Sequence, residues 1–227
     1  MPTIFQQLEA AKDQLHARIA KFTPVDEGHR FSWPNYVYTG PNFRRAHLDI
    51  VDARDTKKLY MLHMTVFPNT DDPAPIFGFD IIAGPNKVTG AFHDFSPVSK
   101  SHPLLDWFAN SVSNKAWSKV RELPDWAKAI FSGHMVAAGN ISDETELEQL
   151  LELVITNLDY YLKNIGEVSC GVDFSEAQDW YCQNQKKNPH TPKVMAALGL
   201  DKNEVDMFIE KCLFPEIKDA TVAVLAG

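Results

Sequence analysis

Five short runs of strand-like composition between residues 30 and 95 limit the possible folds more than any other feature. The runs lie at 30–38, 43–51, 59–67, 76–82 and 88–95, and clusters of Pro, Gly, Asn and Asp separate them. These links are too short to contain a crossover helix, so successive strands are expected to pair antiparallel. Pro34 cannot donate a ladder hydrogen bond, which favours an edge position for the first run.

Helical patterns flank the strand region on both sides. Before it, apolar residues recur at helical spacing: Ile4, Leu8, Ala11, Leu15 and Ile19. After it, the pattern over 147–165 predicts a long amphipathic helix, with Ser142 as its N-cap and Gly166 as its stop. Shorter helices are expected over 175–187 and 194–214.

The order helix, strands, helices is typical of the α+β class. We predict a single α/β/α sandwich domain over residues 1–227, with a central antiparallel sheet flanked by helices. A chain of 227 residues buries roughly 70% of its unfolded surface, which is enough to enclose a ligand.

Charge and cysteine usage exclude several function classes. The net charge of −8, without a basic stripe, argues against a nucleic-acid partner. The three cysteines, Cys170, Cys182 and Cys212, have neither metal-ligand spacing nor an even number for a disulfide framework. No signal peptide or membrane-spanning stretch is evident, so a cytoplasmic protein is expected.

The common nucleotide, flavin and zinc-hydrolase motifs are missing from the sequence. It contains no GxGxxG, GxxxxGK[ST], GxSxG or HExxH. Any chemistry therefore has to come from residues outside these patterns, and no metal site or bound cofactor is expected.

Polar residues interrupt three of the apolar strands. Period two places His47 and Asp49 on one face of their strand. In the next strand, His63 lies on the face opposite a wholly apolar one. Asp80 interrupts an otherwise apolar run that reads as a buried strand. A buried carboxyl resists ionisation, so Asp80 is expected to keep a proton near neutral pH, as a general acid must. Each residue alone also fits a satisfied polar group of the fold, and both interpretations stay open here. His93 and Asp94 are expected to make strand-end hydrogen bonds and a turn.

Four motifs carry a family resemblance: FRRAHLD at 43–49, LHMTVFP at 62–68, PIFGFDIIAGP at 75–85 and DFSP at 94–97. They resemble F-R-K-x-H-L-E, L-H-x-x-x-F-P, P-x-F-G-x-D-I-V-A-G-P and D-L-S-P of the ferredoxin-dependent bilin reductases. The segments ELPDW at 122–126 and YCQNQKKN at 181–188 are also similar to that family.

The resemblance implies an enzyme that reduces an open-chain tetrapyrrole, usually biliverdin IXα. Reduction proceeds without metal or flavin, because reduced ferredoxin supplies single electrons and the protein supplies protons to bilin radicals. Asp80 matches the central proton donor of the family, and His63 matches the histidine that shares a proton near the bilin lactams. His47 matches a second histidine that lines the pocket. A monomer is the state that the family suggests.

Two departures from the family pattern bear on the product. The members with the most similar motifs, the phycocyanobilin:ferredoxin oxidoreductases, have Glu where this chain has Asp49, and that Glu is associated with reduction of the D-ring exovinyl group. The family often places an acidic donor for A-ring chemistry near Asn188, which Pro189 follows here. Asn188, water or Asp80 would then serve as donor, and Lys193 would pair with a bilin propionate or remain a solvated lysine.

The expected activity is reduction of biliverdin to phycoerythrobilin through 15,16-dihydrobiliverdin, with Asp49 as a third catalytic residue. The alternatives are phycocyanobilin, a two-electron stop at 15,16-dihydrobiliverdin, and a bilin carrier without catalysis.

Overall fold

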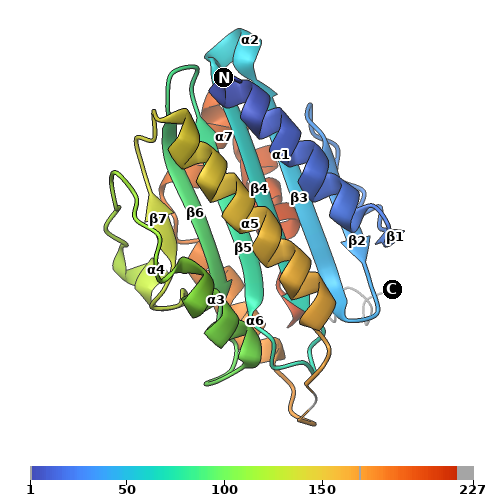
Figure 1. Ribbon diagram of the computed structural model, residues 1–227. Coiled ribbons are helices and arrows are strands. Elements are labelled where there is room, and N and C mark those ends of the chain that lie inside the picture. Colours follow the sequence, from blue (N-terminus) through green and yellow to red (C-terminus); the bar gives the residue numbers. More distant parts are fainter. Residues whose placement is uncertain (1, 169, 219–227) are drawn as a thin grey trace.

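The computed structural model describes residues 2–168 and 170–218, which form three layers of secondary structure (Figure 1). Within these residues, seven strands form one antiparallel sheet in chain order: β1 (Thr23–Pro24), β2 (Asn35–Thr39), β3 (Phe43–Ala53), β4 (Leu59–Pro68), β5 (Ile76–Ala83), β6 (Val88–Ser96) and β7 (Val136–Ala138). The helices are α1 (Ile4–Ile19), α2 (Arg54–Lys57), α3 (Pro103–Val112), α4 (Asp125–Lys128), α5 (Glu144–Asn164), α6 (Ser175–Gln185), α7 (His190–Ala197), α8 (Lys202–Met207) and the π-helical η1 (Phe208–Leu213). None of these described helices is both long and apolar enough to span a membrane. The architecture is the predicted α+β sandwich.

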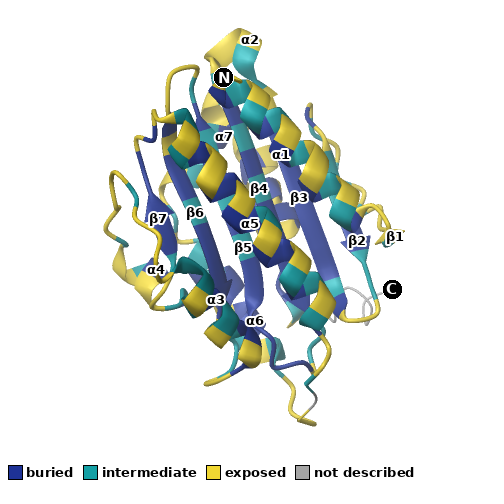
Figure 2. Ribbon diagram, in the orientation of Figure 1, coloured by how far each residue is buried: buried dark blue, intermediate teal, exposed yellow. Residues whose placement is uncertain are grey.

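One face of the sheet is apolar and packs against α1, α3 and α5 (Figure 1). Its core includes Leu48, Leu62, Met64 and Phe77, all of which are fully buried. Figure 2 shows the buried strands beneath helices whose outward stripe is exposed. Because period two sends every second side chain to this face, the residues between them lie on the other one.

The other face is covered by α6, α7, α8 and η1, which lie behind the sheet in Figure 1. A second apolar cluster forms there and includes Trp33, Tyr181, Met195 and Phe208. These helices leave a cavity over the middle of the sheet.

The register of the sheet brings the polar side chains of this second face into line. Asn35, Asp49, His63, Asp80 and Phe92 oppose one another directly across β2 to β6. Directly opposed residues in antiparallel strands have Cα atoms about 4.5–5.5 Å apart. The three ionisable residues therefore lie on adjacent strands in one row, as the strand pattern predicted.

A buried hydrogen-bond network supports β5 from the apolar face. His93 Nδ1 lies 2.8 Å from the carbonyl oxygen of Gly78. Its Nε2 lies 3.1 Å from Asn157 Nδ2, and Trp107 Nε1 donates to Asn157 Oδ1 at 3.1 Å. His93 therefore links β5 and β6 to α5, rather than making the strand-end turn that the sequence suggested.

Three boundaries differ from the sequence predictions. The first run forms a strand only over Asn35–Thr39, and the short β1 pairs with it, so β2 is not the edge strand. Asp143, not Ser142, caps α5, because its carboxylate accepts from Glu146 N at 2.8 Å. The predicted helix over 194–214 is divided, since Gly199 has φ +103° and a new helix begins after the Asp201 cap.

Gly166 offers a test of this packing at the end of α5. It has φ +85°, and a Cβ there would come within 2.5 Å of Asn42, whose side chain is held by a 2.8 Å hydrogen bond to Ile165 O. Gly171 has φ +68° and open space around it. We expect Gly166→Ala to lower the free energy of unfolding by ~2 kcal/mol or more, and Gly171→Ala by ~1 kcal/mol, since only the first adds a clash to the backbone strain. Urea unfolding of both variants measures the difference, and equal losses would contradict the packing argument.

Candidate active site

A cavity of about 730 Å³ lies between the second face of the sheet and the C-terminal helices. Its floor is the sheet, and Asp49, His63 and Asp80 line it. Pockets for small organic ligands are typically about 300–1,000 Å³ in volume. The cavity is thus large enough for a substantial ligand placed directly over the row of ionisable residues.

Asp49 is held rigidly at one end of this row. Trp33 Nε1 and Asn35 Nδ2 both donate to its Oδ1 atom, at 2.7 and 2.8 Å. The residue is only 3% exposed, and burial raises the pKa of Asp49 to about 7 although both N–H donors lower it. Because Oδ1 accepts two hydrogen bonds, Oδ2 is the oxygen that carries a proton.

Asp80 occupies the middle of the cavity floor and faces the open space. Its side chain is 33% exposed, and burial raises the pKa of Asp80 to about 7. Its Oδ1 lies 3.9 Å from His63 Nδ1, beyond the reach of a hydrogen bond. A ligand that displaces water from the cavity will raise the pKa of Asp80 further, because it deepens the desolvation.

His63 is the neutral member of the row. Burial lowers the pKa of His63 to about 4, and the nearby Arg45 charge acts in the same direction. The Phe214 ring packs nearly perpendicular to its ring, with centroids 5.7 Å apart. Its Nε2 is buried and has no hydrogen-bond partner among the described residues.

His47 lies next to His63 but does not line the cavity as predicted from the resemblance. The two rings have centroids 5.9 Å apart, and His47 is fully buried. Burial lowers the pKa of His47 well below its usual value. His47 therefore packs beside the cavity, on the same face of the sheet, as a neutral ring.

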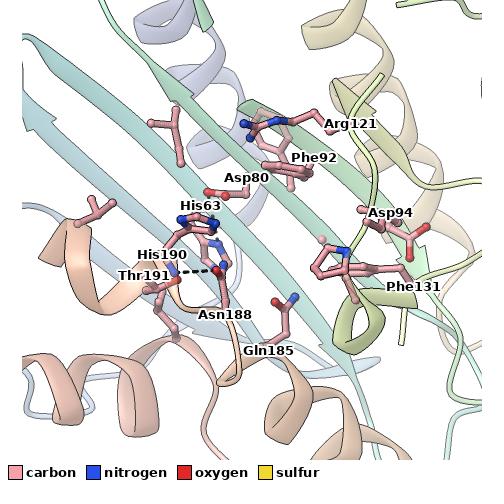
Figure 3. A pocket seen from close by; sticks show the side chains of 18 of the residues that line it. His63, Asp80, Phe92, Asp94, Arg121, Phe131, Gln185, Asn188, His190 and Thr191 are labelled. Carbon is pink, nitrogen blue, oxygen red and sulfur yellow. Dashed lines mark hydrogen bonds and ion pairs between the residues drawn. The ribbon is translucent and has the colours of Figure 1, made fainter. Parts of the chain in front are cut away.

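The opposite wall comes from the segment that leads into α7 (Figure 3). His63 and Asp80 point from the sheet towards Asn188, His190 and Thr191. Asn188 Oδ1 accepts from His190 N at 3.0 Å, so its Nδ2 atom is the group left to donate to a ligand. Lys193 is exposed on α7 and is not part of the wall.

Two further residues that line the cavity, Asp94 on β6 and Arg121, were not predicted as site residues. Asp94 accepts from Ser132 N at 2.9 Å, from Ser96 Oγ at 2.9 Å and from Ser132 Oγ, and burial raises the pKa of Asp94 to about 6. It fixes the loop after α4 against the sheet. The Arg121 guanidinium lies 5.8 Å from the centroid of the Phe92 ring and supplies positive charge at the cavity. Strand alternation puts Asp94 on the cavity face and is a signal that could have identified it, whereas no sequence pattern indicates Arg121.

The floor thus presents two carboxyls that are half protonated near neutral pH and a neutral imidazole. Carboxyls with such pKa values donate and accept protons readily at physiological pH. No cluster of His, Cys, Asp or Glu suited to a metal ion occurs in the described part of the chain. The arrangement fits successive proton transfers to one ligand.

Comparison with known proteins gives consistent matches. The sequence model described as "Ferredoxin-dependent bilin reductase" matches residues 3–215. A phycocyanobilin:ferredoxin oxidoreductase of Prochlorococcus marinus is 27% identical, over 91% of this chain and 91% of its own. That of Synechococcus sp. (strain CC9902) is 31% identical, over 79% of this chain and 74% of its own.

Two solved structures have a similar fold. A protein called PcyX superposes with a TM-score of 0.70 and is 32% identical, covering 92% of this chain and 99% of its own. Phytochromobilin synthase from tomato, in complex with biliverdin, has a TM-score of 0.69 and is 13% identical, covering 93% of this chain and 83% of its own.

The raised pKa of Asp49 predicts a pH dependence of stability. Between about pH 4 and 7 the folded state keeps a proton that the unfolded state releases, so wild-type stability falls as pH rises through this window. Asp49→Asn retains an oxygen for Trp33 and Asn35 and lacks this loss. We expect the free energy of unfolding of Asp49→Asn, relative to wild type, to rise by ~2 kcal/mol or more from pH 4.5 to 8, within the ~4 kcal/mol that three pKa units represent.

Urea unfolding at several pH values measures this difference. The exposed Asp55→Asn serves as the control and should show no comparable rise. A relative stability of Asp49→Asn that is flat with pH would contradict the raised pKa.

Proposed function

Because the chain belongs to the ferredoxin-dependent bilin reductase family, we propose that it reduces biliverdin IXα to phycoerythrobilin through 15,16-dihydrobiliverdin. It is an oxidoreductase that acts on bilins. The tomato relative was solved with biliverdin, and this supports biliverdin as the substrate. Reduced ferredoxin is the electron donor, and the protein itself needs no bound metal, flavin or nicotinamide.

One observation carries the proposal: Asp49, His63 and Asp80 lie in a single cross-strand row on the floor of the cavity. A bilin is a long conjugated ligand whose reduction requires protons at several carbons. The two carboxyls of this row have pKa values near neutrality, which supports protonation at separated positions of one bound molecule.

The reaction consists of two reductions of two electrons each. In the first, two reduced ferredoxins give one electron each and two protons are added across the C15 methine bridge. In the second, two further electrons and two protons reduce the A-ring diene. In each stage the first electron leaves a bilin radical that takes a proton, the second electron and second proton give the closed-shell product, and every ferredoxin leaves oxidised.

Asp80 is the proposed first donor because it faces the cavity and keeps its proton near neutral pH. His63, 3.9 Å away, accepts or returns a proton through the bilin lactam or a water between the two residues. Asn188 Nδ2 and water are the proposed donors for reduction of the A ring. Lys193 stays a predicted partner of a propionate that extends beyond the wall.

Asp49 governs the choice of product in this proposal. Its carboxyl is tied through Oδ1 to Trp33 and Asn35, so it cannot move forward into the cavity without losing both bonds. It also falls short of a glutamate by one methylene, or roughly 1.5 Å. A misplacement on the order of 1 Å can cost about 10²-fold in rate. Reduction of the exovinyl group is therefore slower than A-ring reduction.

Anaerobic turnover of biliverdin with reduced ferredoxin tests the activity and the role of Asp80 together. We expect wild type to turn over biliverdin, and Asp80→Asn to bind it with turnover slowed by roughly 10²-fold, because the nearly isosteric amide cannot supply the proton. Visible spectra should show a radical that accumulates in the variant.

Asp55→Asn is the matched control and should behave as wild type. A wild-type protein that binds biliverdin without any turnover would identify a carrier instead of a reductase. Near-normal turnover by Asp80→Asn would exclude Asp80 as the donor.

Chromatography of the products tests the role of Asp49. We expect wild type to yield phycoerythrobilin, and Asp49→Glu to divert part of the product to a bilin with a reduced exovinyl group, because the carboxyl then reaches further. Asp49→Asn keeps the shorter length without an acidic proton and should give no exovinyl-reduced product. If wild type already produces phycocyanobilin, the argument from side-chain length is wrong. A single product of 15,16-dihydrobiliverdin would limit the reaction to its first stage.

A further inference from the structure

Cys212 lies fully buried in the π-helical turn η1, which covers the same face of the sheet as the cavity. Its Sγ atom is 3.0 Å from Asn35 Nδ2 and 3.7 Å from His47 Nε2. Short π-helical segments are frequent at functional sites. This thiol thus contacts both His47 and the amide that holds Asp49.

Arg45 fixes the turn relative to β3. Its guanidinium makes two hydrogen bonds to Glu27, both 2.8 Å long, and its Nη2 donates to the carbonyl oxygen of Cys212 at 2.7 Å. Arg45 is only 4% exposed and lies on the same strand and face as His47 and Asp49. The position of the thiol is therefore set by the strand that carries two site residues.

The chemistry of the three groups determines the direction of their hydrogen bonds. Burial raises the pKa of Cys212 to about 12, so the residue is a thiol with one S–H to donate. The Asn35 Nδ2 atom is a donor and cannot accept this proton. His47 is neutral because burial lowers its pKa, so one ring nitrogen is free to accept. Among the side-chain contacts of Cys212, His47 Nε2 is the acceptor.

We propose that Cys212 is a positioning residue that selects the tautomer of His47 and aligns Asn35. Its S–H donates to His47 Nε2, which places the ring proton on Nδ1. Its sulfur accepts one Asn35 N–H while the other is donated to Asp49 Oδ1. One buried thiol therefore sets both the proton position on His47 and the orientation of the Asp49 carboxyl.

The selected tautomer fixes the proton of a buried ring that packs against His63. Nδ1 is buried and has no hydrogen-bond partner among the described residues, so the ring proton on it is not shared with another side chain. In the opposite tautomer the ring proton is on Nε2. The thiol proton then has no acceptor among these contacts, and Nδ1 carries no proton. The effect of this choice on bilin reduction rests on the proposed function, whereas the tautomer itself does not.

Two-bond ¹H–¹⁵N correlation spectra of the ligand-free protein test the tautomer directly. His47 is assigned by comparison with a His47→Asn variant. We expect a neutral ring with its proton on Nδ1. A wild-type His47 with its proton on Nε2 would overturn the proposal without any variant of Cys212 and without an activity measurement.

Three cysteine variants then test whether the thiol causes this state. Cys212→Ala removes the donor, and we expect a mixture of both tautomers. Cys212→Ser keeps a donor and an acceptor and should retain mainly the Nδ1–H form. Cys182→Ala is the matched control, because this buried thiol donates to Pro215 O and contacts neither His47 nor Asn35. An unchanged tautomer in Cys212→Ala, or an equal change in Cys182→Ala, would contradict the proposal.

Turnover with biliverdin adds the catalytic readout. We expect Cys212→Ala to lower kcat by about tenfold or more with KM within about twofold, and Cys212→Ser to restore most of the rate, because a misplaced group affects the transition state more than binding. If wild type shows no turnover while His47 carries its proton on Nδ1, the proposed function fails and the positioning role stands. A fall in kcat that is equal for Ala and Ser would contradict a role of the thiol as hydrogen-bond partner.

Discussion

The desolvation of ionisable groups in the middle of an otherwise apolar sheet is the constraint on which this structure depends. Asp49 and Asp80 keep protons near pH 7 because they are buried, and His47 and His63 stay neutral for the same reason. In water, the carboxyls would be ionised at this pH. The layer of α6, α7, α8 and η1 over this face is therefore part of the chemistry, since it limits the water contact that would restore ordinary pKa values.

The apolar face offsets the cost of that polar burial. Its core joins α1, α3 and α5 to alternate residues of the same strands that carry the polar row. Tyr161 of α5 donates to Pro75 O at 2.7 Å, and the His93 network reaches Gly78 O, so both contacts hold the strand that carries Asp80. A strand anchored from one side can hold a carboxyl on its other side in a fixed position. Positional accuracy of this kind is what general acid catalysis requires.

Much of this arrangement could be predicted from the sequence, and the rest depended on long-range contacts. Period two placed Asp49, His63 and Asp80 on one face, and short links made their strands neighbours, so the row followed from local rules. The partners Trp33 and Asn35 could not be found, because the turn of the chain before β2 is set by packing against Phe208, far away in sequence. The division of 194–214 depended on the positive φ of Gly199. The sequence also could not predict that Arg121, and not Lys193, lies at the cavity, because the path of the chain between elements decides this.

The two carboxyls reach similar pKa values by different routes, and this difference divides their work. Burial alone raises the pKa of Asp80, whose side chain remains open to the cavity and makes no strong hydrogen bond. For Asp49, burial is opposed by two N–H donors, and the charge of Asp80 raises the pKa again. The pair is therefore coupled, so loss of one proton makes loss of the second harder. Once Asp80 has protonated a bound ligand, its new charge holds the proton on Asp49 more tightly. Asp49 then donates only to an atom that reaches its fixed Oδ2, and geometry rather than acidity limits which carbon it serves.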